Sequence, residues 1–259
     1  MNKKGPNLRI GFFLILFVIS SLAYDKNFSY RKYEHVKGFI EPLVKQTVEL
    51  GIKYDIPPAA LLAIASVESG YGRGYVASIT GNILSLGAGR KDKELPALYL
   101  PHTTKSYTVL YNQKIIKSYE KNQLVWKKRP KSLKKDYRPK NIAGTANLLD
   151  YFDDKKEEKL RANLENIRDF CQKWISLNNS HKVFQDARKY LNNEVKKRGK
   201  EILFSEDLNV KFIQSIGGKK NSFNYRTSWG KKVVKVLHKT GAVKLTKDIH
   251  EKKQFAQVW

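Results

Sequence analysis

The feature that most constrains the fold is an apolar segment from Ile56 to Gly70. Pro57 and Pro58 stand where the first turn of a helix tolerates proline, and Gly70 suits the left-handed position that follows a helix. Between these ends nearly every residue is apolar, on all sides of the predicted helix. A helix without a polar face needs neighbours all round it. We therefore expect this helix in the middle of a globular domain.

Glu68 is the exception in this helix, because it places a carboxyl four residues after Ile64 and three after Ala65. Desolvation and the negative end of the helix dipole both favour the neutral acid, so both raise its pKa. A carboxyl with a raised pKa suits the proton donor that glycosidases use on the departing sugar oxygen. The alternative is a glutamate that pairs with a buried cation, or one that emerges into solvent at the helix end.

Apolar side chains at three- and four-residue spacing predict further helices around this one. The first of these should end at Gly51, and the last near Gly241. The stripes cover 36–50, 160–175, 184–195, 212–216 and 229–237.

Two short segments predict a small hairpin. In 107–111 aromatic or apolar residues alternate with others, and 123–127 is rich in β-forming residues. Six glycines between residues 70 and 89 predict an irregular loop region rather than a regular element. The expected fold class is therefore mainly α (α+β), a helical lobe with a small β-containing lobe.

Residues 1–23 have the pattern of a secretory signal peptide, with basic residues ahead of an apolar run, 10–23, that ends in small residues. The run is shorter than the ~20 apolar residues of a spanning helix, so cleavage after Ala23 is the simplest interpretation. An uncleaved signal anchor is the alternative. Either way we expect an exported protein, periplasmic or extracellular, with one domain over 24–244 and a polar C-terminal tail over 245–259.

Charge limits the partners of such a protein. The chain has 50 Lys and Arg against 24 Asp and Glu, a net charge of +26. Residues 112–140 hold 11 of these cations against Glu120 and Asp136, which makes a basic lobe. A surface of this kind attracts anionic envelope polymers. Export argues against a nucleic-acid partner.

Cysteine and histidine limit the cofactors. Cys171 is the only cysteine, which excludes intramolecular disulfides and cysteine-based metal clusters. The five histidines are scattered, with no spacing that would hold a metal on one helix face. We expect no metal, no cofactor and a monomeric chain.

Two motifs in order resemble a known family. The run 61–72 ends in Glu68-Ser69-Gly70-Tyr71-Gly72 and is followed by Gly81-Asn82-Ile83-Leu84. It is similar to the glycoside hydrolase family 73 peptidoglycan glucosaminidases, also called the mannosyl-glycoprotein endo-β-N-acetylglucosaminidase-like domain. That family shows an apolar helix, then Glu-Ser-Gly-Trp-Gly, then Asn-Asn-Leu-Phe-Gly. Tyr71 stands in place of the usual Trp, and Gly81 and Ser85 depart from the second motif.

A third motif extends the resemblance towards the C-terminus. The run Asn224-Tyr225-Arg226-Thr227-Ser228-Trp229-Gly230-Lys231-Lys232-Val233 resembles the family's Tyr-Ala-Thr-Asp-Pro-x-Tyr-Ala-x-Lys-Ile element, shortened by two residues. By that likeness Tyr225 is the active-site tyrosine and Trp229 the aromatic residue that starts the last helix. The alternative for Tyr225 is an ordinary half-buried tyrosine. The resemblance covers about residues 40 to 240, and 86–222 carries no clear motif.

The resemblance implies a lysozyme-like fold, with Glu68 as the general acid and with Tyr71, Asn82 and Trp229 in substrate binding. It also implies a second acidic residue in the β-containing lobe. Glu120 is the favoured candidate, because it precedes the strand at 123–127. Asp92 and Glu94 remain open, as does a glutamate that is simply solvated at the surface.

The implied activity is hydrolysis of β-1,4 bonds in peptidoglycan glycan strands, of the endo-β-N-acetylglucosaminidase type. Water activation and assistance by the substrate's own acetamido group both remain possible mechanisms. A lytic transglycosylase of the same superfamily is one alternative, although the chain lacks the Gly-Leu-Met-Gln type segment that usually follows its Glu. A non-catalytic module that binds the cell wall or envelope is another.

Overall fold

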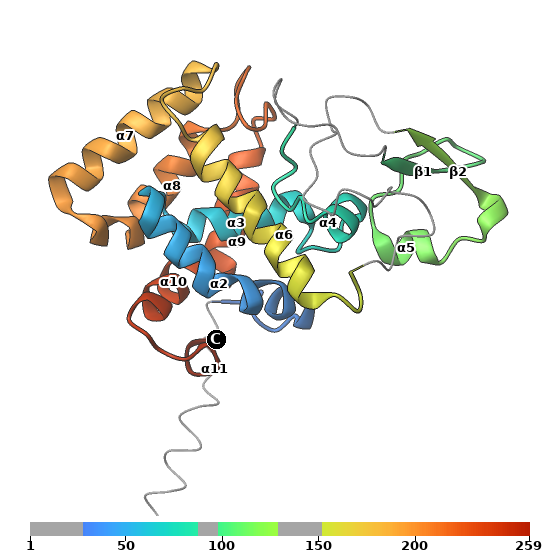
Figure 1. Ribbon diagram of the computed structural model, residues 1–259, viewed down its shortest axis with the longest axis horizontal. Coiled ribbons are helices and arrows are strands. Elements are labelled where there is room, and N and C mark those ends of the chain that lie inside the picture. Colours follow the sequence, from blue (N-terminus) through green and yellow to red (C-terminus); the bar gives the residue numbers. More distant parts are fainter. Residues whose placement is uncertain (1–27, 88–97, 129–151) are drawn as a thin grey trace, which may run out of the picture.

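The computed structural model describes residues 28–87, 98–128 and 152–259. A larger helical lobe lies beside a smaller β-containing lobe (Figure 1). The helical lobe contains α2 (Glu34–Tyr54), α3 (Pro58–Ser69), α6 (Lys156–Asp169), η5 (Phe170–Trp174), α7 (Lys182–Arg198), η6 (Lys200–Phe204), α8 (Glu206–Ser215), α9 (Trp229–Thr240), α10 (Ala242–His250) and α11 (Phe255–Val258). The β-containing lobe contains α4 (Tyr75–Thr80), β1 (Tyr99–Thr103), α5 (Gln113–Lys117), η2 (Lys121–Gln123) and β2 (Leu124–Lys128).

Helix α3 is the centre of the helical lobe, as its all-apolar sequence predicts. It contacts α2, α8, α9 and α10, and its side chains from Pro58 to Ser66 are buried. The N-terminal end of α3 is capped from α8, because Asn209 Oδ1 accepts the Ala60 N–H at 2.8 Å. Each buried Leu or Ile on such a helix contributes about 1.5–3 kcal/mol relative to an exposed position. The predicted end is also confirmed, with Gly70 in the left-handed conformation (φ 56°).

Helix α2 runs further than the sequence predicts. We expected it to end at Gly51, but Gly51 is a buried residue inside the helix, which ends at Tyr54. A Cβ at Gly51 would lie 2.7 Å from the carbonyl oxygen of Ile56. The glycine is therefore needed for close approach of the next segment, and Asp55 takes the left-handed capping position (φ 52°) instead.

The C-terminal residues are also more ordered than predicted. The expected polar tail, 245–259, instead forms most of α10 and all of α11. Leu245 is fully buried, and α10 packs against α2 and α3. Arg31 ties this end to the start of the described chain, since its guanidinium donates to the carbonyls of Thr240 and Val258. A few apolar residues are enough to pack α10 against the core, because they lie on one face of this short helix.

The β-containing lobe has a two-stranded antiparallel sheet, with Tyr99 opposite Lys128 and Thr103 opposite Leu124. The strand predicted near 123–127 is confirmed as β2. Its predicted partner at 107–111 was wrong, because that segment makes only a single bridge and the true partner is β1. Pro101 inside β1 hides the strand pattern, since proline is tolerated only where no ladder N–H is needed.

The loop region expected at 70–89 contains a six-residue helix, α4, between its glycines. Tyr75 and Ile79 of α4 are buried in a small separate core with Leu98, Leu100 and Ile116. This second core gives the β-containing lobe its own packing.

The expected fold class is confirmed: the protein is mainly α, with a small β-containing lobe. In the described ranges no helix is long and apolar enough to cross a membrane. The expected signal peptide, 1–23, lies outside the described residues.

Candidate functional site

Glu68 lies in the last turn of α3, next to a tightly bonded turn. Ser69 Oγ donates to the carbonyl of Ala65 at 2.6 Å and accepts the Gly72 N–H at 2.8 Å. Gly70 then reverses the chain with a positive φ. These bonds hold the backbone on both sides of Glu68, so the carboxyl projects from a rigid base.

Trp229 contacts Glu68 directly. Its Nε1–H donates to Glu68 Oε1 at 2.7 Å, which joins α3 to the first residue of α9. The indole is 3% exposed and packs on Gly217, where a Cβ would lie 2.1 Å from the ring atom Cε3. Only glycine leaves room for the ring. Gly217 therefore determines where Trp229 lies, and Trp229 in turn holds the carboxyl.

Asn224 supplies a second donor to the carboxyl from the loop before α9. Its carbonyl accepts the Gly218 N–H at 2.8 Å, and its Oδ1 accepts the Arg226 N–H at 3.1 Å. Because the amide oxygen is engaged in this way, the amide NH₂ is the group that bonds the Glu68 side chain. The loop thus brings an amide donor and a guanidinium to the same carboxyl.

Burial raises the pKa of Glu68 above its ordinary value. The hydrogen bonds from Trp229 and Asn224 and the charge of Arg226 act in the opposite direction, because each stabilises the carboxylate, but they do not cancel the effect of burial. The result is an oriented carboxyl that keeps its proton to a higher pH than a solvated glutamate. That is the property required of a general acid.

A cavity of about 310 Å³ adjoins Glu68. Its walls come from both lobes, because the end of α3 lies on one side and α4 and Tyr111 on the other. The lining residues are Glu68, Ser69, Gly74, Tyr75, Val76, Ala77, Asn82, Ser85, Leu86 and Tyr111. A carboxyl with a raised pKa in the wall of a cavity between lobes is a candidate active site.

Comparisons with known proteins give one structural likeness. No protein-family model matches the chain, and no curated protein matches it significantly. Among solved structures the chain is similar to the crystal structure of the catalytic domain of the autolysin Auto from Listeria monocytogenes. The TM-score is 0.44 at 12% sequence identity, over 93% of this chain and 98% of that chain. This likeness assigns no function. Function is inferred below from the site itself.

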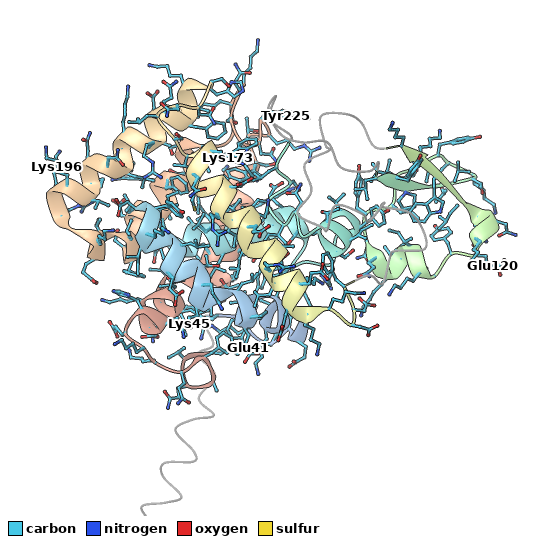
Figure 2. The ribbon with its side chains drawn as sticks, in the orientation of Figure 1. Glu41, Lys45, Glu120, Lys173, Lys196 and Tyr225 are labelled. Atoms are coloured by element: carbon cyan, nitrogen blue, oxygen red, sulfur yellow. The ribbon has the colours of Figure 1, made fainter. Side chains whose placement is uncertain are left out.

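Tyr225 follows Asn224 on an exposed stretch of the loop and is not among the residues that line the Glu68 cavity. Its side chain is 69% exposed, and the guanidinium of Arg226 lies 5.9 Å from the ring centroid. Figure 2 shows it on the part of the helical lobe nearer the β-containing lobe. The structure therefore places Tyr225 next to Asn224, which bonds Glu68, and leaves its hydroxyl accessible to a substrate. Its catalytic role remains a prediction.

Glu120 is not brought to Glu68. It is the N-terminal cap of η2, where its side chain and that of Gln123 form a capping box. Figure 2 shows Glu120 exposed at the outer end of the β-containing lobe. This position gives no support to Glu120 as the second catalytic group, and that role stays a prediction. The other candidates, Asp92 and Glu94, lie outside the described residues.

Asn82, expected to bind substrate, is 2% exposed and holds the backbone together. Its Nδ2 donates to the carbonyl of Leu86 at 3.0 Å, and its Oδ1 accepts the Leu86 N–H at 2.8 Å and the Asn166 amide at 3.1 Å. These hydrogen bonds engage the Asn82 amide within the protein, where it holds the loop that lines the cavity. Trp229, also expected to bind substrate, is too buried to stack on a sugar and instead holds Glu68.

Tyr71 faces away from the Glu68 cavity. Its ring packs edge-on against His35 and Phe39, and it lines a separate cavity of about 490 Å³ between α2 and α6. Its hydroxyl is buried without a hydrogen-bond partner among the described residues. Burial raises the pKa of the Tyr71 phenol. The expected role in substrate binding has no support from this position.

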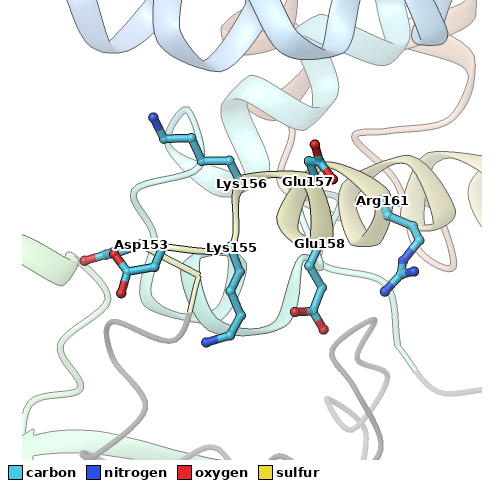
Figure 3. Close-up of a pocket in the computed structure, with 7 residues that line it drawn as sticks. Asp153, Lys155, Lys156, Glu157, Glu158 and Arg161 are labelled. Atoms are coloured by element: carbon cyan, nitrogen blue, oxygen red, sulfur yellow. The ribbon is translucent and has the colours of Figure 1, made fainter.

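A third hollow, at the start of α6, carries many charged side chains (Figure 3). Acidic and basic residues alternate around it, and it shares no lining residue with the Glu68 cavity. The lining residues are Asp153, Asp154, Lys155, Lys156, Glu157, Glu158 and Arg161. The mixed charges give it no preference for an anion or a cation.

Sequence reasoning missed two residues of the site, Asn224 and Gly217. Asn224 was noticed only as the start of a motif, and Gly217 follows the predicted stripe at 212–216. The one local signal was a pair of glycines shortly before an aromatic residue that begins a helix. Neither residue has a pattern of its own, because each acts through a contact with Trp229 or Glu68.

Proposed function

We propose that the chain is a glycoside hydrolase that cleaves β-1,4 bonds in the glycan strands of peptidoglycan, with Glu68 as the general acid. One observation carries the proposal: a carboxyl with a raised pKa is held by the Trp229 and Asn224 donors at the wall of a cavity between two lobes. The motif resemblance around Glu68 and Tyr225 supports the endo-β-N-acetylglucosaminidase type.

In this mechanism the protonated Glu68 donates its proton to the departing sugar oxygen as the glycosidic bond breaks. The positive charge that develops on the sugar ring is then relieved by water or by the substrate's own acetamido group. The accessible Tyr225 hydroxyl is proposed to orient either group by hydrogen bonding. After the reaction Glu68 is a carboxylate, which the Trp229 N–H and the Asn224 amide stabilise until it is reprotonated.

The proposal includes an exported protein that acts on the envelope. Its support is the signal-like pattern of residues 1–23 and the net charge of +26, which favours contact with anionic polymers. The described part of the basic lobe is 112–128, where Lys127 and Lys128 lie exposed on β2.

The test compares Glu68→Gln with Glu41→Gln, which changes an exposed glutamate on α2 in the same way (Figure 2). Purified peptidoglycan is digested, reduced with borohydride, and the chain ends are identified by mass spectrometry. We expect reducing N-acetylglucosamine ends from the wild type and from Glu41→Gln. Glu68→Gln should be slower by about 10² to 10⁴, the usual contribution of a general acid.

Other outcomes would identify the alternatives. Cyclised ends that resist reduction would show a lytic transglycosylase. Binding of strands without any cleavage would show a non-catalytic module. A folded Glu68→Gln variant with more than about a tenth of wild-type turnover would exclude Glu68 as the acid.

A further inference from the structure

The cations of the chain are distributed unevenly around the site. Between Asp207 and Asp248 the sequence contains no acidic residue, although the chain as a whole has 24. The same stretch contains many basic residues: Lys211, Lys219, Lys220, Arg226, Lys231, Lys232, Lys235, Lys239, Lys244 and Lys247. It includes the loop and the start of α9, which together hold Glu68.

Elsewhere on the described surface many basic side chains are neutralised by acidic neighbours. Lys173 and Lys182, for example, each form an ion pair with an aspartate four residues away, at 3.1 and 3.7 Å. The hollow of Figure 3 likewise mixes both signs. Pairs of this kind reduce the field that a surface presents to an anionic ligand.

Six basic residues on the loop before α9 and on α9 itself differ in this respect, and we call them the cationic rim. They are exposed, and none forms an ion pair with any residue in the described ranges. The members are Lys219, Lys220, Arg226, Lys231, Lys232 and Lys235. Because no acidic residue adjoins them in sequence, an anionic ligand would reduce their mutual repulsion.

The rim is built on the same backbone as the site. The Gly218 N–H bonds the Asn224 carbonyl, which closes the loop that carries Lys219 and Lys220. Arg226 is close enough to lower the pKa of Glu68 against the effect of burial. Lys231 and Lys232 follow Trp229 in the first turn of α9. The rim residues therefore lie on the loop and the helix that carry the two donors to Glu68, and Arg226 acts on the carboxyl directly.

We infer that the cationic rim binds negative charges carried by the strand that Glu68 cleaves, and so selects an anionic glycan over a neutral one. This inference rests on the proposed function. The ligand chemistry is a carboxylate or phosphate on or next to the sugars in the site. The attraction acts within about one Debye length, ~8 Å at physiological salt, so substituents near the scissile bond contribute most. Such contacts are the same in the ground state and the transition state, so they change KM and leave kcat unaltered.

The test uses two triple variants with the same change of charge. The rim variant is Lys219→Gln, Lys220→Gln and Lys232→Gln. The control variant is Lys189→Gln, Lys196→Gln and Lys197→Gln, on exposed positions of α7. Figure 2 shows Lys196 at the end of the helical lobe opposite the β-containing lobe, far from Tyr225.

Both variants are assayed on three substrates: peptidoglycan strands with their peptide carboxylates, the same strands after amidation of those carboxylates, and strands that retain phosphate-bearing wall polymers. We expect the rim variant to raise KM about tenfold at 0.1 M salt on the charged substrates, with kcat unchanged. The effect should disappear at 1 M salt, and the control variant should behave as the wild type. Loss of the effect on amidated strands identifies carboxylates as the ligand. An effect confined to strands with wall polymers identifies phosphates.

Equal KM values for the rim and control variants would overturn the inference. Co-sedimentation with the same strands, measured in a Glu68→Gln background, gives a second readout that needs no cleavage. If the wild type does not cleave the strands, and the rim variant binds them more weakly than the control does, the proposed function is wrong but the inference about the cationic rim holds. If the wild type cleaves and both variants bind equally, only the rim fails.

Discussion

Replacing Trp229 with Phe tests whether one hydrogen bond adjusts the acidity of Glu68. Phe keeps an aromatic ring against Gly217 but removes the N–H that lies 2.7 Å from Glu68 Oε1. That N–H stabilises the carboxylate more than the neutral acid, so its loss should raise the pKa of Glu68 further. The change is informative because most active-site substitutions are expected only to lower activity.

The size of the shift follows from the type of bond. A hydrogen bond to a charged group contributes about 1.5–3 kcal/mol, and one pKa unit corresponds to about 1.4 kcal/mol. Loss of the bond should therefore raise the pKa of Glu68 further, because this donor stabilises the carboxylate. Glu68 must be protonated to act as the acid, so the alkaline limb of the pH profile should move to higher pH. The maximum rate should fall as well, because the carboxyl loses one of its two orienting donors.

The assay is the pH dependence of kcat/KM on soluble glycan strands, which reports the pKa of the free enzyme. Trp259→Phe is the matched control, because that indole lies at the C-terminus and stacks on Phe255. Its profile should coincide with that of the wild type. An alkaline limb for Trp229→Phe that stays in place or moves to lower pH, in a folded variant, would refute the reasoning.

Two further predictions concern the packing around the site. Gly217→Ala should destabilise the fold by about 3 kcal/mol and reduce activity, because the new Cβ would clash with the Trp229 ring. Gly230→Ala is the control: a Cβ there has no atom within 4 Å, so the change should leave stability equal or slightly higher. Urea unfolding midpoints of the two variants measure the difference. Tyr71→Phe should leave activity unchanged and stability equal or higher by about 1 kcal/mol, because it removes a buried hydroxyl that has no partner among the described residues. A clear rise in KM, or a clear loss of stability, for Tyr71→Phe would show that the hydroxyl binds substrate or stabilises the fold.

Much of the helical lobe could be predicted from the sequence, because helical periodicity is a local property. The central position of α3 follows from its lack of a polar face, and the unusual carboxyl at Glu68 is visible in the same twelve residues. Helix α9 and its aromatic start, Trp229, were predicted in the same way, although α10 and α11 follow the helix that we expected to be the last. In each case the information lies within one element.

The errors occurred where structure depends on contacts between elements. We predicted that Gly51 ends a helix, but a glycine is needed there because the Ile56 backbone approaches it closely. Pro101 concealed β1, whose strand character comes from pairing with β2. Residues 245–259 were expected to form a polar tail, yet one buried face of α10 is enough to pack that helix against the core. Composition and spacing do not carry this information.

The sequence by itself determined an apolar central helix, a carboxyl near its end and a strongly basic surface. Only the tertiary structure decided that Trp229, 161 residues away, would donate to that carboxyl and that Asn224 would join it. It also engaged the Asn82 amide in hydrogen bonds with Leu86 and made Glu120 the N-terminal cap of η2. The physical reason is that a raised pKa and an oriented proton donor arise from burial and from distant donors, and neither is encoded in a local pattern.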